Sequence, residues 1–353
     1  MNDDLVRPAV KSILDYIPGK AAPGVIKLSS NENPFGPSPK ALKAIAAEAK
    51  KLQAYPDQKA TVLRQALAKK IKLSPDNIIC GSGLDDILQI IAETYLSPGD
   101  EVILAKNSFS VYELVSRIAD AKLIWVDLKD FGLDLPAMRR AMTEKTKIVF
   151  LTNPHNPTGS AFNAAAFDSF MQGLPANVII IVDEAYADFA AMKDFPNPIK
   201  YVAAGQNVFV LRTFSKYYGL AGLRLGYAVG TKELIAPLSK VKMPFNVNRL
   251  AQAGGLAALE DKAFLNKTYK NNLEQKQYLY AELKKLGLGY NETQANFIYV
   301  DVEQPAKEFC QKLIRLGVSV RPLTSFGFPE AIRISVGTPE QNKKLIAALQ
   351  KAL

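Results

Sequence analysis

Short runs rich in β-branched residues alternate with helical patterns through the first two thirds of the chain, and this alternation constrains the fold most strongly. The runs include NIIC, EVILA, KIVFL, NVIIIVD and NVFVLRT. They are continuous rather than alternately polar and apolar, which is typical of strands buried on both faces of a parallel sheet. Helical patterns, such as that of residues 85–95, separate most of them. The order predicts an α/β fold with a mostly parallel sheet, in which the closely linked runs 207–212 and 223–229 make one antiparallel pair.

The pattern changes after residue 246. A long helical region at 247–286 is followed by the runs NFIYVDV, VSVRPL and AIRISVG, which predict strands around a helix at 305–316. Proline and glycine interrupt every pattern near the N-terminus. We therefore expect three parts: an N-terminal arm (1–30) that joins the small domain, a large cofactor-binding domain (31–246) and a small C-terminal α+β domain (247–353).

Charge and composition narrow the classes of partner. The chain of 353 residues has 44 Lys and Arg against 34 Asp and Glu, a formal net charge of +10. Its lysines are spread along helical patterns beside Glu and Ala, which favours solvated helix faces over a nucleic-acid site. No apolar run approaches the roughly 20 residues of a membrane span. We expect neither a nucleic-acid nor a membrane partner.

The scarce residue types narrow the chemistry. Cys80 and Cys310 lie far apart in apolar segments, and the polar N-terminus does not resemble a signal peptide, so we expect a cytoplasmic protein. The single histidine, His155, excludes zinc sites that need several histidines, and no metal site is expected. Catalysis is expected to depend on Lys, Asp, Tyr and Arg, or on a bound cofactor.

Two glycine-containing segments follow predicted strands. CGSGLDD (80–86) opens a helix after NIIC, where backbone N–H groups can bind a phosphate, although glycines there can also serve only the turn. TNPHNPTG (152–159) ends the strand KIVFL, at the edge where open α/β sheets bind ligands. Asn156 can donate a hydrogen bond there, but the segment can also be a simple proline-rich turn.

Two further segments carry charged residues in apolar surroundings. Asp183 ends the strand in IIIVDEAYADF. It is either a helix N-cap or a buried carboxylate that needs a cation such as a protonated ring nitrogen. LRTFSKYYGLAGLRLGY places Lys216, a candidate Schiff-base former, eight residues before the phosphate-binding candidate Arg224. A phosphate cradle, a lysine, a buried aspartate and an arginine together indicate pyridoxal phosphate.

The chain resembles the fold-type I aminotransferases and, within them, the histidinol-phosphate aminotransferases. The segments that carry the resemblance are KLSSNENPFGPSP, AYPD, NPHNPTG, VDEAY, TFSKYYGLAGLRLGY and IRISVGTPEQN. They span nearly the whole chain. The resemblance implies an α/β large domain of aminotransferase fold type I, pyridoxal 5′-phosphate as cofactor and a homodimer with shared active sites.

The resemblance also implies a role for each matching residue. Lys216 holds the cofactor and moves the proton, Asp183 pairs with the pyridine nitrogen, and Tyr186 bonds the ring oxygen. The other residues implied to bind the cofactor are Gly83, Leu84, Asp85, Phe109, Asn156, Thr213, Ser215, Arg224 and, from the neighbouring subunit, Tyr55. Those implied to bind the substrate are Tyr16, Asn33, Arg321 and Arg333. One departure is Leu84, since GSGLDD stands where the family usually has Ser-Asp-Glu after the second glycine.

The activity implied is amino transfer from histidinol phosphate to 2-oxoglutarate, a reaction of histidine biosynthesis. An aromatic amino acid aminotransferase or a phosphothreonine decarboxylase of the same fold would share almost all of these motifs. A non-enzymatic alternative is a nucleic-acid-binding regulator built on an aminotransferase scaffold. Such a regulator should carry an added helix-turn-helix segment, for which 353 residues leave no room.

Overall fold

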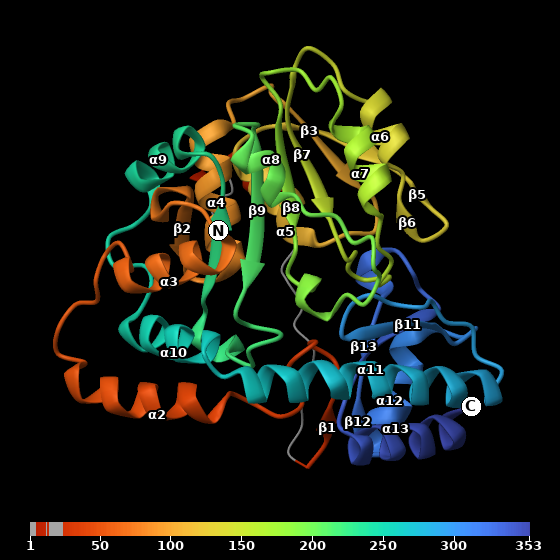
Figure 1. Ribbon diagram of the computed structural model, residues 1–353. Helices are drawn as coiled ribbons and strands as arrows, with labels where there is room; N and C mark the ends of the chain where they lie inside the picture. Colours follow the sequence, from red (N-terminus) through yellow and green to blue (C-terminus); the bar gives the residue numbers. More distant parts are fainter. Residues whose placement is uncertain (1–4, 12, 14–23) are drawn as a thin grey trace.

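A seven-stranded sheet forms the centre of the larger part of the molecule (Figure 1). The structure is a computed structural model that describes residues 5–11, 13 and 24–353. The strand order is β2-β10-β9-β8-β7-β3-β4. These strands are β2 (Ile78–Gly81), β3 (Glu101–Ala105), β4 (Lys122–Val126), β7 (Thr146–Thr152), β8 (Ile179–Asp183), β9 (Val208–Thr213) and β10 (Gly226–Val229). The predicted α/β class with a mostly parallel sheet is confirmed.

The connections explain the directions of the strands. β4, β3, β7, β8 and β9 run parallel to one another. β10 is antiparallel to both β9 and β2, as predicted, because the link from β9 to β10 has no crossover helix. The carboxyl ends of the parallel strands therefore share one edge, where Thr152 is in register with Asp183. This edge positions the residues predicted to be functional.

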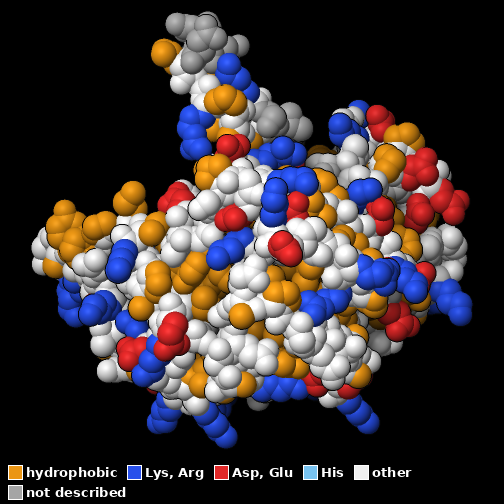
Figure 2. All heavy atoms as spheres, turned by 90° about the horizontal axis from the view of Figure 1, so that it is seen from above, with side chains coloured by type: hydrophobic (Ala, Val, Ile, Leu, Met, Phe, Trp, Pro, Cys, Tyr) orange, Lys and Arg blue, Asp and Glu red, His pale blue; other side chains and the backbone are white. Residues whose placement is uncertain are grey.

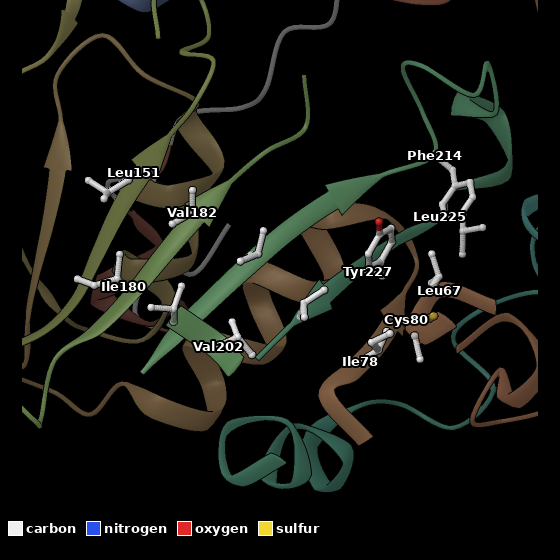
Figure 3. Packing of buried hydrophobic residues seen from close by; sticks show 14 of the residues in the cluster. Leu67, Ile78, Cys80, Leu151, Ile180, Val182, Val202, Phe214, Leu225 and Tyr227 are labelled. Atoms are coloured by element: carbon white, nitrogen blue, oxygen red, sulfur yellow. The ribbon is translucent and has the colours of Figure 1, made fainter. Parts of the chain in front are cut away.

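Helices cover both faces of the sheet. They are α2 (Pro39–Glu48), α3 (Thr61–Ile71), α4 (Gly83–Tyr95), α5 (Ser110–Ile118), α6 (Leu135–Arg140), α7 (Ala164–Met171), α8 (Ile199–Ala203), α9 (Lys232–Val241) and α10 (Arg249–Leu259). Alternate strand residues point to opposite faces, so the sheet contributes to two apolar cores. Figure 3 shows one of them, where Val182 and Tyr227 lie with Leu67 and Cys80. Continuous apolar strands are thus explained by burial on both sides.

The smaller part has its own sheet and core. Its elements are β11 (Phe297–Asp301), α12 (Ala306–Arg315), β12 (Val318–Ser319), β13 (Arg321–Pro322), β14 (Ala331–Ser335) and α13 (Pro339–Ala352), with α11 (Lys262–Lys285) leading into it. β11, β14 and β13 pair in that order, and β12 pairs with β1 (Ile26–Lys27). Leu28 lies in this core. The end of the predicted arm is therefore part of the small domain.

Two sets of contacts cross the predicted boundaries between the parts of the chain. The short helix α1 (Pro8–Lys11) packs against α5, and Arg7 Nη2 donates to the Ile118 carbonyl at 2.9 Å, so this part of the arm contacts the large domain. α10 lies in the predicted small domain yet packs on α2, because Gly254 lets the helices approach: a Cβ there would be 3.0 Å from Ile45. The chain therefore passes from the core of the large domain to the core of the small domain along α11, which begins after residue 246.

The surface shows no concentration of one charge on the face drawn in Figure 2. Lys and Arg side chains are scattered over it with Asp and Glu between them. Across the described ranges, no helix is both long enough and apolar enough to cross a membrane.

Candidate active site

A cavity of about 290 Å³ lies where the carboxyl ends of β7, β8 and β9 meet the small domain. Its walls come from both domains and from the segment of residues 29–32. The structure brings most of the predicted site residues together here: Leu84, Asp85, Phe109, Asn156, Asp183, Tyr186, Thr213, Ser215, Lys216, Arg224, Arg321 and Arg333. Residues as distant in sequence as Leu84 and Arg333 thus face one cavity.

Three other predicted residues do not line this cavity, and a fourth is not among the described residues. Gly83 begins α4 directly beneath Arg224, and a Cβ on it would be 2.5 Å from Arg224 Nη2. Asn33 does not line the cavity, because its amide donates to the Tyr217 carbonyl at 2.9 Å and to Thr268 Oγ1 at 3.1 Å. Tyr55 lies outside the cavity and is 78% exposed. Tyr16 lies outside the described residues.

Lys216 follows β9 and points into the cavity. Its Nζ donates to the Ser30 carbonyl at 2.9 Å. Burial, followed by the positive charge of Arg333, lowers the pKa of Lys216 to about 8, and Arg224 adds to this while Glu32 opposes it. A larger neutral fraction at neutral pH makes this amine a better nucleophile and base than an ordinary lysine.

Asp183 ends β8 and is buried. Its Oδ1 accepts the Ala185 N–H at 2.9 Å, and its Oδ2 accepts the Tyr112 hydroxyl at 2.6 Å. Thr152 Oγ1 in turn donates to the Tyr112 hydroxyl at 3.0 Å. Burial raises the pKa of Asp183, against the effect of the Tyr112 hydrogen bond. A cation placed beside this carboxylate would restore its charged form.

One end of the cavity offers donors for an anion. α4 begins there, so its first backbone N–H groups have no partner within the helix. Arg224 lies beside the helix start, with Nη2 3.1 Å from Asp85 Oδ2. Thr213 and Ser215 add hydroxyl groups to the same lining. A helix N-terminus, two hydroxyls and a guanidinium together form a site suited to a phosphate.

The other end carries two arginines from the small domain. Arg321 of β13 and Arg333 of β14 are direct partners in an antiparallel pair, so their side chains share one face. They are 7% and 6% exposed, and both line the cavity. Like charges placed opposite each other are unfavourable, and an anion with several oxygens offsets their repulsion.

Arg333 also orients the large domain's Asn156. Its Nη1 donates to Asn156 Oδ1, and its Nη2 donates to the Ser29 carbonyl at 3.2 Å. Because the Asn156 oxygen is thus engaged, the group this amide offers to a ligand is its N–H donor. Tyr186 lies nearby, buried, with its ring edge-on to Phe297 at 5.0 Å between centroids. Burial raises the pKa of Tyr186, so its hydroxyl stays protonated at neutral pH.

Sequence reasoning missed several residues of the lining: Ser29, Ser30, Asn31, Glu32, Tyr112, Thr152 and Phe326. Two signals were present. Tyr112 lies in the first turn of α5, three positions after the N-cap residue Phe109, so both can face the same side. Residues 29–32 belong to the segment KLSSNENPFGPSP, in which only Asn33 was singled out.

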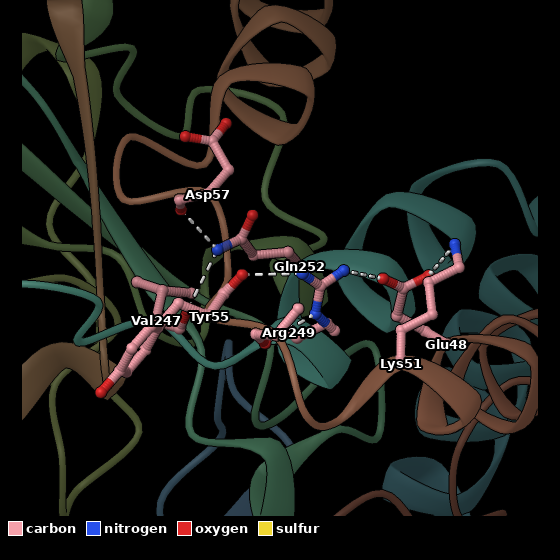
Figure 4. A network of polar contacts seen from close by, with 8 residues as sticks. Glu48, Lys51, Tyr55, Asp57, Val247, Arg249 and Gln252 are labelled. Atoms are coloured by element: carbon pink, nitrogen blue, oxygen red, sulfur yellow. Dashed lines mark hydrogen bonds and ion pairs between the residues drawn. The ribbon is translucent and has the colours of Figure 1, made fainter.

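A second group of contacts holds Tyr55 at the surface (Figure 4). Arg249 of α10 donates from Nη2 to the Tyr55 carbonyl at 2.7 Å and pairs through Nη1 with Glu48. Gln252 of the same helix donates to the Asp57 carbonyl at 2.8 Å. The Tyr55 ring stacks on Phe245, with centroids 4.6 Å apart. The backbone of this loop is therefore fixed while its aromatic ring projects outward.

Comparison with known proteins shows that this chain is similar to members of one family. Residues 23–349 match the family Aminotransferase class I and II. The chain is 44% identical to the histidinol-phosphate aminotransferase of Moorella thermoacetica, over 98% of this chain and 92% of that protein. It is 41% identical to that of Symbiobacterium thermophilum, over 99% and 98% respectively. The crystal structure of histidinol-phosphate aminotransferase from Sinorhizobium meliloti in complex with pyridoxal-5′-phosphate superimposes with a TM-score of 0.90, at 28% identity, covering 99% of this chain and 97% of that one.

Proposed function

The chain belongs to the class I and II aminotransferases, and on that basis we propose that it transfers the amino group of histidinol phosphate to 2-oxoglutarate with pyridoxal 5′-phosphate as cofactor. The products are the corresponding oxo compound and glutamate, and the reaction belongs to histidine biosynthesis. One observation carries the proposal: Lys216 and Asp183 face a single cavity that is also lined by residues at the start of α4, by Arg224 and by the Arg321–Arg333 pair.

The residues present fit this cofactor. The start of α4, with Thr213, Ser215 and Arg224, would hold its phosphate, and the space over Gly83 is one that a Cβ would fill. Asp183, a buried carboxylate, suits a protonated ring nitrogen. Asn156 and Tyr186 would donate to the ring oxygen, Phe109 would cover a ring face, and Lys216 would hold the carbonyl carbon. When bound, the cofactor supplies an electron-withdrawing ring that accepts the electron pair of the broken Cα–H bond.

The chain's own residues then account for the proton movements. Lys216 Nζ removes the proton from Cα of the amino donor and returns one in the second part of the transfer. Its low pKa, about 8, keeps part of the amine neutral and able to accept that proton. Asp183 keeps a proton on the ring nitrogen by offering it a negative partner in a buried place. The same two groups act again, in reverse, when 2-oxoglutarate takes up the amino group.

The small-domain arginines account for the substrates. Histidinol phosphate and 2-oxoglutarate have different side chains, but each carries a negatively charged group away from the reacting carbon. Arg321 and Arg333 face the cavity from one sheet face and can make bidentate contacts to a phosphate or a carboxylate. One cationic pair thus serves both half-reactions.

A substrate panel tests the function. The purified enzyme, given pyridoxal phosphate and 2-oxoglutarate, should form glutamate fastest from histidinol phosphate. Phenylalanine and tyrosine test the aromatic alternative, and release of carbon dioxide from phosphothreonine tests the decarboxylase alternative. A preference for either alternative would contradict the substrate proposed, whereas glutamate formed from phenylalanine would still agree with amino transfer.

A homodimer with shared active sites is part of the proposal. Tyr55 is 78% exposed and stacks on Phe245, and Met243, two residues before Phe245, is 72% exposed, so the loops 52–58 and 243–246 present apolar side chains to solvent. Such a surface suits a second copy of the chain. In this arrangement the fixed Tyr55 loop brings a hydroxyl to the phosphate site of the partner subunit.

Mixed subunits test the shared sites. Lys216→Ala and Tyr55→Phe subunits, unfolded and refolded together, should form hybrid dimers in which one site has both native residues. Activity above the sum of the two parents supports sharing. A fully active monomer in sedimentation would contradict the dimer.

We also place the protein in the cytoplasm. This is supported by Cys80 and Cys310, which are both buried and not joined to each other, as expected of a reducing compartment. Cell fractionation with detection of the untagged protein tests this location.

A further inference from the structure

Residues Ser29, Ser30 and Asn31 connect the small domain to the catalytic groups of the large domain. Leu28, the residue before them, forms backbone hydrogen bonds with Ser319 of β12 and Ser335 of β14 in the small domain. Each of the next three carbonyls then accepts one hydrogen bond. The donors are Arg333 Nη2 to Ser29 at 3.2 Å, Lys216 Nζ to Ser30 at 2.9 Å and Asn296 Nδ2 to Asn31 at 3.0 Å.

Asn31 is the most constrained of the three. It is 1% exposed, and its backbone is left-handed at φ 55°, a conformation that asparagine tolerates better than most residues. Its backbone N–H donates to Ser335 Oγ at 2.8 Å, and its Oδ1 lies 3.1 Å from the same oxygen. Its Nδ2 lies 2.9 Å from the Tyr186 hydroxyl oxygen. The side chain therefore bridges the small-domain strand β14 and a large-domain tyrosine.

The directions of these hydrogen bonds follow from the groups involved. A backbone N–H can only donate, so Ser335 Oγ accepts from Asn31 and gives its own proton to Asn31 Oδ1. That choice leaves Nδ2 toward Tyr186, and an amide nitrogen can only donate. The Tyr186 oxygen must then accept. Its own proton is left to point to another partner, and Tyr186 lines the cavity.

We propose that Asn31 is a positioning residue that makes the Tyr186 hydroxyl a hydrogen-bond donor toward the cavity. The inference rests on the proposed function, in which Tyr186 contacts the ring oxygen of the cofactor. Asn31 touches neither cofactor nor substrate in this proposal; it acts through Tyr186. Since Ser335 fixes the Asn31 amide and lies two residues after Arg333 on β14, the strand that binds substrate also sets this donor.

The charged groups that face Tyr186 act on the same region. Lys216 Nζ lies 5.9 Å from the centre of the Tyr186 ring, and Arg333 and Asp183 exert opposite electrostatic effects on its hydroxyl. Of these groups and Asn31, the Asn31 amide is the one that hydrogen-bonds the hydroxyl oxygen, and as a donor it leaves the hydroxyl proton to another partner.

The test is the pH titration of the visible absorption of the bound cofactor. A donor to the ring oxygen stabilises its deprotonated form, so loss of that donor raises the titration midpoint. Asn31→Ala should raise the midpoint, and Tyr186→Phe should raise it by about one pH unit. Asn31→Asp is the sharper variant. Its carboxylate would accept the Tyr186 proton and turn it away from the cavity, so its midpoint should rise at least as far as that of Tyr186→Phe.

Two further variants keep the test decisive. Ser335→Ala leaves Asn31 in place but removes the hydroxyl that orients it, so the titration midpoint should rise by less than in Asn31→Asp. This variant tests the role even if Asn31→Asp does not fold. In a Tyr186→Phe background, Asn31→Ala should add no further shift. The matched control is Asn272→Ala, which removes another buried amide, bonded to the Ala295 carbonyl at 3.3 Å, and should leave the midpoint unchanged.

The outcomes separate the inference from the function on which it rests. If Tyr186→Phe raises the midpoint but the Asn31 and Ser335 variants do not, the positioning role is overturned and the proposed function stands. If the wild type shows no visible band with pyridoxal phosphate, the proposed function fails first. A shift in Asn272→Ala equal to that in Asn31→Ala would reduce the effect to lost stability and overturn the role.

Discussion

The two ends of the cavity are built in different ways. At the large-domain end, Asp183 and Thr213 are the last residues of neighbouring strands, and the sheet itself fixes their spacing. At the small-domain end, Arg333 and Asn31 are held by side-chain hydrogen bonds that join residues up to 304 positions apart. The large-domain end suits chemistry that must not vary between substrates. The small-domain end depends on how two cores pack, which suits the recognition of different anions.

The largest effect is expected for Lys216→Ala. Without this amine, none of the described residues at the cavity is in place to bond the cofactor covalently and move the Cα proton, so turnover should fall by at least about 10⁴-fold with every substrate. The visible band of the purified protein, which borohydride should abolish in the wild type, should lose its pH dependence. Absorption spectra and steady-state rates measure both.

Lys276→Met is the matched control for that change. Lys276 is also buried, and desolvation lowers its pKa to about 8 as well, but its Nζ donates to the Thr293 carbonyl, away from the cavity. The variant should retain the visible band and turnover. An active Lys216→Ala enzyme would contradict the assignment of the large-domain end.

Asp183→Asn is expected to have the next largest effect. The amide can keep the Tyr112 hydrogen bond but offers no negative charge to a ring nitrogen, so kcat should fall by about 1,000-fold while the protein folds and binds cofactor. Glu184→Gln is the control. Glu184 is the adjacent buried carboxylate, paired with Arg212 at 2.7 Å, and its loss should lower the melting temperature without a specific loss of kcat. Near-normal kcat in folded Asp183→Asn protein would refute the role.

Arg321→Ala tests the other end of the cavity. Losing a charged hydrogen bond to a bound anion should lower kcat/KM for histidinol phosphate by at least about 30-fold. Phenylalanine, which has no side-chain anion, should be affected much less. Arg315→Ala, at an exposed arginine of α12, should change neither value. An equal loss with both donors would mean that this end does not select the substrate, and the contrast between the two ends would fail.

The smallest effect concerns the pH dependence of cofactor capture. The pKa of Lys216 in the protein without cofactor is about 8 rather than 10.5, so the rate of pyridoxal phosphate binding should rise about tenfold between pH 7 and pH 9 and then level off. The folded chain releases this proton at lower pH than the unfolded chain. The same shift should therefore increase stability as the pH rises from about 8 to 10.5. Stopped-flow absorbance and thermal unfolding measure the two effects; a capture midpoint near pH 10.5 would contradict the low pKa.

The sequence by itself determined the sheet and the large-domain end of the cavity. Continuous apolar runs can be stable strands only when both faces are covered, and a polar residue at the end of such a run must lie at the sheet edge. The pattern of apolar runs is therefore enough to place Asp183 and Lys216 at one edge, where both line the cavity. The antiparallel β10 followed in the same way from the short link after β9.

Only the tertiary structure decided what closes the cavity from the other side. Asn33 and Asn31 stand two positions apart in the same motif, yet the first bonds Tyr217 and Thr268 while the second reaches Tyr186. No local pattern distinguishes them, because their partners come from remote parts of the chain. The position of α10 was decided in the same manner: the helix follows residue 246 but packs on α2. Local propensity sets where a helix or strand forms, whereas the burial of its apolar face against a remote partner sets where it lies.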